Sequence, residues 1–115
     1  MKGSASIALC VPLLLLLPAA ALAERSVWGY GVRSCADFLR ARTDQGANSA
    51  AELQRYEDWL TGFVTGLNLA TGEDVLRGSG IQAAMDRTAA YCKGKPDADF
   101  FNASMDFVRT LSSVK

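Results

Sequence analysis

The most constraining feature of the chain is the stretch of residues 49–71, which has one clear helical periodicity. Its large apolar side chains recur at steps of three and four residues and form one stripe: Leu53, Tyr56, Trp59, Leu60, Phe63, Val64 and Leu67. This pattern predicts a long helix with one buried face. Ser49 and Glu52 have the spacing of a capping box, so we expect the helix to begin at Ser49. The other segments are expected to pack around it.

Two glycines, Gly62 and Gly66, lie four residues apart on one strip of this predicted helix. Each costs about 1 kcal/mol of helix stability relative to alanine, so each needs a packing or functional reason. Either another helix comes close to the strip, or the strip borders a groove for a ligand or a partner. The sequence favours the close helix contact and leaves the groove as the alternative.

The first 23 residues have the three parts of a secretory signal peptide. Lys2 gives a positive start, residues 7–18 form an apolar run, and Ala21-Leu22-Ala23 is a small-residue cleavage site. We therefore expect cleavage after Ala23 and a periplasmic or secreted mature protein. The apolar run is shorter than the roughly 20 residues that a membrane span needs, so no membrane association is expected after cleavage.

The mature chain keeps two of the three cysteines, Cys35 and Cys92. In an exported protein an even cysteine count indicates a disulfide, and only one pairing exists here. Removing 23 of the 115 residues leaves 92, a length at which a core alone gives marginal stability. A bridge closing a loop of this size adds about 4 kcal/mol in the chain-entropy estimate. A redox role is the alternative, but the cysteines lack CxxC spacing.

Residues 24–33 show no helical periodicity and are expected to form an extended or loose arm. Its two aromatic residues, Trp28 and Tyr30, either dock on the domain or contact a partner, and the sequence favours docking.

Residues 34–115 are expected to form one helical domain. Besides the long helix, the patterns predict helices at about residues 35–42 and 81–93, and a last helix ending near Ser113. Ser34, Ser79 and Asp97 are their expected caps. No segment has the pattern of a strand. The predicted fold class is therefore all-α: a small single domain of four helices with one disulfide, after an N-terminal signal peptide.

The composition argues against catalysis. The chain has no histidine, and its two mature cysteines are expected to be paired, so the usual proton-transfer groups and nucleophiles are missing. Glu57-Asp58 and Glu73-Asp74 are adjacent carboxylates, but neighbours in a helix point about 100° apart and cannot share a substrate. Metal-ligand and phosphate-binding patterns are also lacking. We expect no enzyme activity, no cofactor and no metal.

The charge is nearly balanced, with twelve acidic residues against eleven basic ones once Lys2 is removed from the twelve with the signal. Without a basic stripe, nucleic acid is not an expected partner. Protonation of the carboxylates below about pH 4 leaves the positive charges unopposed, and their repulsion loosens a compact state. A binding role that changes with pH is the function class that this composition favours.

Several short motifs, taken in order, resemble the HdeA group of periplasmic acid-stress chaperones. They are SCADFL at 34–39, GF at 62–63, GLN at 66–68, DVL at 74–76, GI at 80–81 and YC at 91–92, before a last aromatic-bearing helix. The resemblance implies a small helical protein with one disulfide, dimeric near neutral pH, that opens in acid and holds unfolding clients through apolar surface. Carried onto this chain, it implies Cys35 and Cys92 as the disulfide. The implied dimer or client surface is Trp59, Phe63, Val64 and Leu67.

The segment YEDWLTGFVTGLN, residues 56–68, with the helix, cysteine and proline-bearing turn after it, is also similar to periplasmic immunity proteins that neutralise type VI amidase effectors. This similarity implies a rigid loop that binds one enzyme, and Glu73, Asp74 and Arg77 are the candidate loop residues. The expected partners are therefore unfolding proteins, a single partner enzyme, or a second copy of the chain. An exported helical domain of unrelated role is the third alternative.

Overall fold

The computed structural model describes residues 26–113, and the predicted signal peptide lies outside them. A short 3-10 turn, η1 (Gly29–Val32), precedes four helices: α2 (Cys35–Thr43), α3 (Ala47–Thr71), α4 (Gly80–Gly94) and α5 (Phe100–Ser112). Within the described residues there is no strand, only an isolated bridge between Ser34 and Asp99. The all-α prediction with four helices is confirmed.

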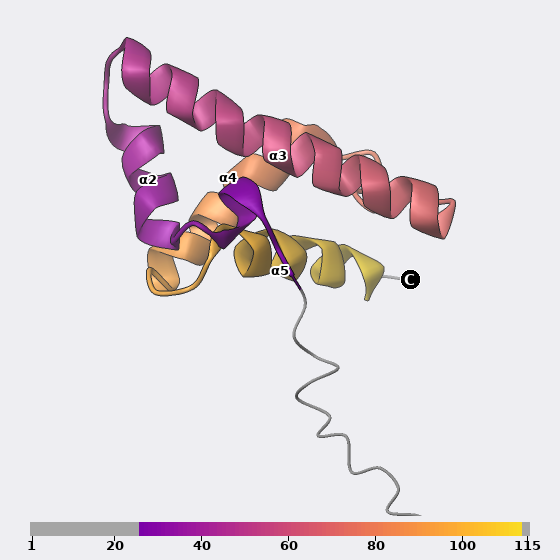
Figure 1. Ribbon diagram of the computed structural model, residues 1–115. Helices are drawn as coiled ribbons and strands as arrows, with labels where there is room; N and C mark the ends of the chain where they lie inside the picture. Colours follow the sequence, from indigo (N-terminus) through magenta and orange to yellow (C-terminus); the bar gives the residue numbers. More distant parts are fainter. Residues whose placement is uncertain (1–25, 114–115) are drawn as a thin grey trace, which may run out of the picture.

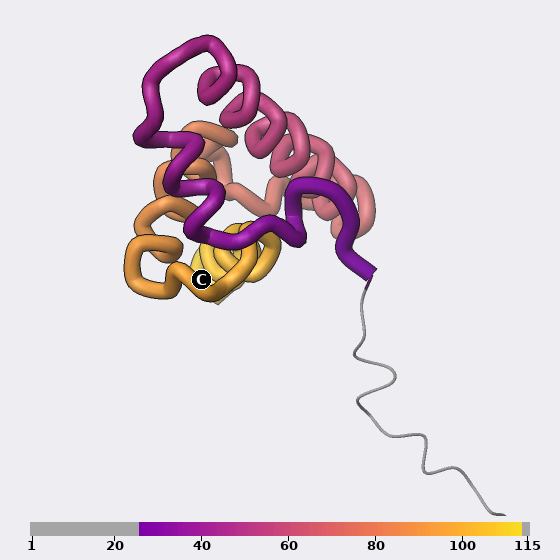
Figure 2. Tube along the Cα trace, turned by 60° about the vertical axis from the view of Figure 1, so that its left-hand side comes forward, coloured from indigo at the N-terminus to yellow at the C-terminus, as the bar shows by residue number. Residues whose placement is uncertain are grey.

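The long helix α3 lies along one side of the molecule, and α4 and α5 lie on the other (Figure 1). The arm of residues 26–33 passes between α3 and α5 before the chain enters α2 (Figure 2). Three fully buried rings fill the centre: Phe38 of α2, Tyr56 of α3 and Phe100 of α5. Their ring centroids lie 4.7 to 5.1 Å apart. One aromatic cluster thus joins three of the helices.

The disulfide between Cys35 and Cys92 is present as predicted, and both residues are fully buried. It joins the first residue of α2 to the last turn of α4 across a sequence separation of 57 residues. Because all of α3 lies inside the closed loop, the bridge restricts the unfolded chain strongly, by about 4 kcal/mol in the chain-entropy estimate.

The predicted start of α3 is wrong, whereas the predicted start of α2 is confirmed. Ser34 caps α2, because its Oγ accepts a hydrogen bond from the backbone N–H of Asp37 at 3.1 Å. The capping box of Ser49 and Glu52 does not mark the start of α3, which begins at Ala47 after Gly46. The Glu52 carboxylate instead accepts from the Tyr30 hydroxyl of the arm. A contact distant in sequence has replaced the local one.

The two later caps also differ from the prediction. Ser79 stands at the N-cap position of α4, but its hydroxyl donates to the Leu76 carbonyl and does not cap the helix. Asp97 does not cap α5. Asp99 does, with its carboxylate accepting from the Asn102 N–H at 2.7 Å. The physical reason is that Asp97 lies in a turn, in which the Ala98 N–H donates to the Lys95 carbonyl at 3.0 Å, and that the extended residue directly before the helix is Asp99, which is bridged to Ser34.

Candidate functional site

The N-terminal arm is held on α3 by two hydrogen bonds. The Trp59 indole Nε1–H donates to the Trp28 carbonyl oxygen at 2.9 Å, and the Tyr30 hydroxyl donates to Glu52 at 3.0 Å. The Tyr30 ring also meets the Tyr56 ring edge-on, with centroids 4.8 Å apart. Tyr30 therefore docks on the core as expected. The Trp28 side chain is 80% exposed and does not, so the partner contact considered for it remains open.

Gly31 lets the arm cross the face of Trp59. Gly31 is buried, and a Cβ built on it would lie 2.2 Å from the Trp59 ring, a separation at which atoms overlap. Only a residue without a side chain fits there, provided that the indole stays in place. This close approach sets how near the backbone of the arm lies to α3.

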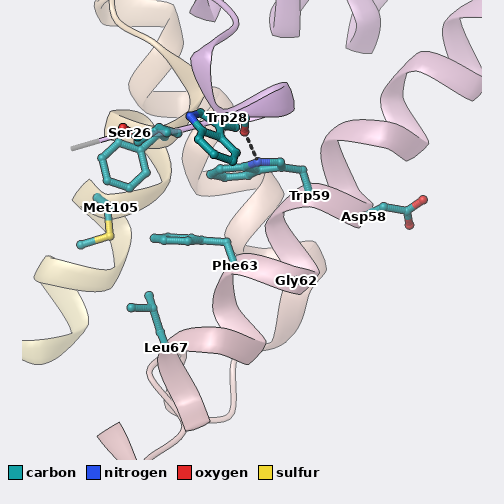
Figure 3. Close-up of a pocket in the computed structure, with 10 residues that line it drawn as sticks. Ser26, Trp28, Asp58, Trp59, Gly62, Phe63, Leu67 and Met105 are labelled. Carbon is teal, nitrogen blue, oxygen red and sulfur yellow. Dashed lines mark hydrogen bonds between the residues drawn. The ribbon is translucent and has the colours of Figure 1, made fainter. Parts of the chain in front are cut away.

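The arm, α3 and α5 enclose an apolar groove of about 670 Å³ (Figure 3). One wall is an aromatic row from α3 and α5. Trp59 and Phe63 are stacked, with centroids 5.2 Å apart and 18° between the ring planes. Phe63 in turn meets Phe101 of α5 edge-on at 5.5 Å. The lining residues are Ser26, Val27, Trp28, Asp58, Trp59, Gly62, Phe63, Leu67, Phe101 and Met105.

The groove is chemically suited to apolar side chains. Asp58 is the charged residue in its lining, and Figure 3 shows the carboxylate pointing away from the space between Trp59, Phe63 and Met105. The groove volume lies in the range of about 300–1,000 Å³ that is common for ligand pockets. Burial of one apolar side chain is worth about 1.5–3 kcal/mol when complete. A ligand in this groove would therefore be held by desolvation and not by charge.

Three of the four predicted surface residues line this groove: Trp59, Phe63 and Leu67. They lie four residues apart and so share one side of α3. Val64 does not join them, because it follows Phe63 by one position and turns into the core, where it is 5% exposed. We therefore leave Val64 out of the candidate surface.

The sequence reasoning missed the groove residues that α5 and the arm supply. Phe101 and Met105 are four residues apart on α5, and this spacing was the available signal for a second apolar wall. It did not show which helix would lie opposite. Which helix lies opposite α3 across the groove depends on how the arm separates α3 from α5.

The predicted close helix contact at Gly62 and Gly66 is wrong. Among the described residues, a Cβ at either position would meet nothing within 4 Å outside its own helix. Gly62 borders the groove, in agreement with the alternative interpretation. Gly66 is exposed, and nothing in the structure explains it.

The connection between α3 and α4 is held by side chain to backbone hydrogen bonds. The Asp74 carboxylate accepts from the N–H groups of Leu76 at 3.0 Å and Gly78 at 2.7 Å. Asn68 accepts from the Val75 N–H at 2.8 Å. Leu76 anchors the loop in the core at 3% exposure.

The three predicted loop residues therefore have different roles. Asp74 shapes the loop, whereas Glu73 and Arg77 are exposed and available to a partner. Together with Gly78 they line a polar hollow of about 500 Å³.

Within residues 26–113 no group of three or more His, Cys, Asp or Glu side chains is placed to hold a metal ion. None of the helices in that range combines the length and apolar character needed to cross a membrane. Comparison of the chain with protein-family models, with curated proteins and with solved structures finds no match.

Proposed function

We propose that this protein is exported and acts as a chaperone under acid stress, binding unfolding polypeptides through the apolar groove. The observation that carries the proposal is the groove itself, an open aromatic surface into which its one charged lining side chain does not point. Unfolding proteins expose apolar side chains, and a surface that offers only desolvation binds them with little regard to sequence. Binding, not catalysis, is the activity that such a surface supports.

The attachment of the arm supports a dependence on acid. Glu52 accepts from Tyr30, and its carboxylate lies 3.6 Å from the Arg33 guanidinium, so two of the arm's contacts use one carboxylate. Carboxylates are protonated at about pH 2, which removes the ionic part of this attachment. The other charged side chains around Glu52 are Asp37, Arg40, Asp44 and Arg55. In acid only the arginines among them stay charged, and their repulsion favours release of the arm.

Release of the arm would widen the groove without dispersing the helices. The arm supplies one wall of the groove, through Val27 and Trp28. The disulfide does not titrate, so α2 and α4 stay joined at every pH. The expected acid form is thus a loosened but tethered domain with more apolar surface.

A matched pair of leucines on α3 tests this proposal. Leu67 lines the groove, whereas Leu69 is 82% exposed and lies outside it. At about pH 2.5 the wild-type protein should suppress aggregation of an acid-unfolded client. Leu67→Gln should require roughly three- to tenfold more protein for the same suppression, because a partly buried apolar contact is lost. Leu69→Gln should behave as the wild type.

The proposal is overturned if the wild-type protein fails to suppress aggregation at low pH, or if Leu67→Gln and Leu69→Gln are equally active. We also propose that the protein is a homodimer at neutral pH, and sedimentation at pH 7 and at pH 3 tests this. Loss of the dimer in acid, together with increased binding of an apolar dye, is the expected result.

The ordered connection between α3 and α4 supports a second candidate, an immunity protein that binds and inhibits one type VI amidase effector. Its backbone is held by Asn68 and Asp74, so Glu73 and Arg77 are presented in a defined geometry. Pre-organisation of this kind favours tight binding to one partner. This candidate predicts a neutral-pH complex with one amidase, which Arg77→Glu disrupts and Leu67→Gln leaves intact.

A further inference from the structure

A second hollow lies beside the first half of α3, and it shares no lining residue with the groove. Its volume is about 370 Å³. In contrast to the groove it is rich in charge, with two arginines and three carboxylates in its lining: Arg33, Arg40, Asp37, Asp44 and Glu52. We refer to it as the polar pocket.

Tyr56 lines the polar pocket and has a hydroxyl group without a partner. The residue is 0% exposed, and its hydroxyl makes no hydrogen bond within the described chain. An unsatisfied buried polar group costs about 1–3 kcal/mol, so its presence in a native core needs a reason.

The Tyr56 hydroxyl is buried beneath the charged residues of the polar pocket. The neighbouring charges that act on its pKa include Arg33, Asp37 and Glu52, which all line the pocket. Burial raises the pKa of Tyr56 to about 12. The group therefore keeps its proton at ordinary pH and can donate a hydrogen bond to an acceptor.

The charges of the pocket are partly compensated. Arg33 pairs with Glu52 at 3.6 Å, and Arg40 pairs with Asp37. Asp44 makes no ion pair among residues 26–113. The pocket thus offers one buried donor without an acceptor and one exposed carboxylate without an ion-pair partner among the described residues.

We propose that the polar pocket binds a small zwitterion of amino-acid or dipeptide size. Its carboxylate accepts from the Tyr56 hydroxyl and lies beside Arg33, and its ammonium group pairs with Asp44. A ligand reaches the hydroxyl through rotation of Arg33 or Glu52, whose side chains are 47% and 31% exposed. The site shares no lining residue with the groove, and although Arg33 and Glu52 also attach the arm, its ligand test at neutral pH does not depend on the chaperone proposal.

The test is a titration of the disulfide-bonded protein with glycylglycine, followed by amide chemical shifts. Glycylglycine should cause saturable shifts at residues 37–44 and 48–56. N-acetylglycylglycine lacks the ammonium group and glycylglycinamide lacks the carboxylate, so each should bind at least tenfold more weakly. Equal binding of the blocked peptides, or no saturable shift with glycylglycine, overturns the proposal.

Two variants separate a binding role from a packing role. Tyr56→Phe should weaken glycylglycine binding by about tenfold, since one hydrogen bond is lost. Asp44→Asn should weaken it to a similar degree, and the exposed Asp106→Asn on α5 should leave it unchanged. Unaltered binding by Tyr56→Phe overturns the proposal, because the hydroxyl is then only a packing feature.

Discussion

The two halves of α3 belong to one continuous helix, yet they border different kinds of surface. The first half, with Glu52 and Tyr56, lines a charged pocket beside α2, whereas the second half, with Phe63 and Leu67, lines an apolar groove beside α5. The arm passes between them at Trp59. The apolar stripe of a helix therefore does not fix the character of its flanks. The segments that pack beside each flank do.

The largest effect is expected from loss of the disulfide, which destabilises the helices that form both surfaces. Replacing Cys35 and Cys92 by serine should lower the free energy of unfolding by about 4 kcal/mol, because the unfolded chain regains the entropy of the closed loop. Urea denaturation measures the change. A loss much below 1 kcal/mol would mean that the helices hold both surfaces without the bridge.

Alkaline pH acts on the first half of α3 through Tyr56. Its folded pKa of about 12 lies above the ordinary value of 10.0, so the unfolded state loses its proton first as the pH rises. Stability is full below pH 10 and falls by about 3 kcal/mol between pH 10 and 12. Denaturation at pH 9 and at pH 12 should show this decrease in the free energy of unfolding in the wild type and in Tyr91→Phe. It should be missing in Tyr56→Phe.

Adding a methyl group to Gly31 acts on the boundary between the two halves. Gly31→Ala should cost about 1–3 kcal/mol, because its Cβ would overlap the Trp59 ring. The Trp59 fluorescence should change and client binding in the groove should weaken. Gly62→Ala is the control, since its Cβ meets open space and alanine stabilises a helix by about 1 kcal/mol. Equal stability of the two variants would contradict the close packing of arm and indole.

The smallest expected effect concerns the attachment of the arm. Glu52→Gln removes the charge that Tyr30 and Arg33 share, and should cost less than about 1 kcal/mol at neutral pH because the ion pair is partly exposed. At about pH 2, where carboxylates are protonated, variant and wild type should have the same stability. Glu57→Gln, whose partner is Gln82 of α4, is the control that leaves the arm untouched. If Glu52→Gln stays less stable than the wild type at low pH, the charge of Glu52 is not what makes the attachment of the arm sensitive to acid.

The sequence was sufficient for those features of the fold that depend on local patterns. The period of α3, the cap at Ser34 and the pairing of Cys35 with Cys92 follow from spacing, from local hydrogen bonding and from the lack of another partner. Local rules failed where a distant contact competes with them. Asp97 is a residue type that favours capping, but it lies in a turn, and Asp99, which is bridged to Ser34, caps α5 instead.

The candidate sites depended more strongly on such distant contacts. Phe63 and Leu67 lie on the predicted helical stripe and were implied as surface residues by the family resemblance, but no local signal places Phe101 opposite them. The polar pocket was not predicted, because the helical pattern indicates only that Tyr56 is a buried aromatic residue. Its unsatisfied hydroxyl becomes visible only when the neighbours from α2 and the arm are in place.

The contact between Gly31 and Trp59 also predicts a pattern in the sequences of related chains. Because the indole occupies the volume that a side chain at position 31 would need, the two positions are expected to vary together. A relative with alanine or a larger residue at 31 should carry a smaller residue at 59, and it would then lack the flat ring that now forms one end of the aromatic row. The identity of a single backbone position in the arm would thus indicate, from sequence alone, which relatives keep this surface.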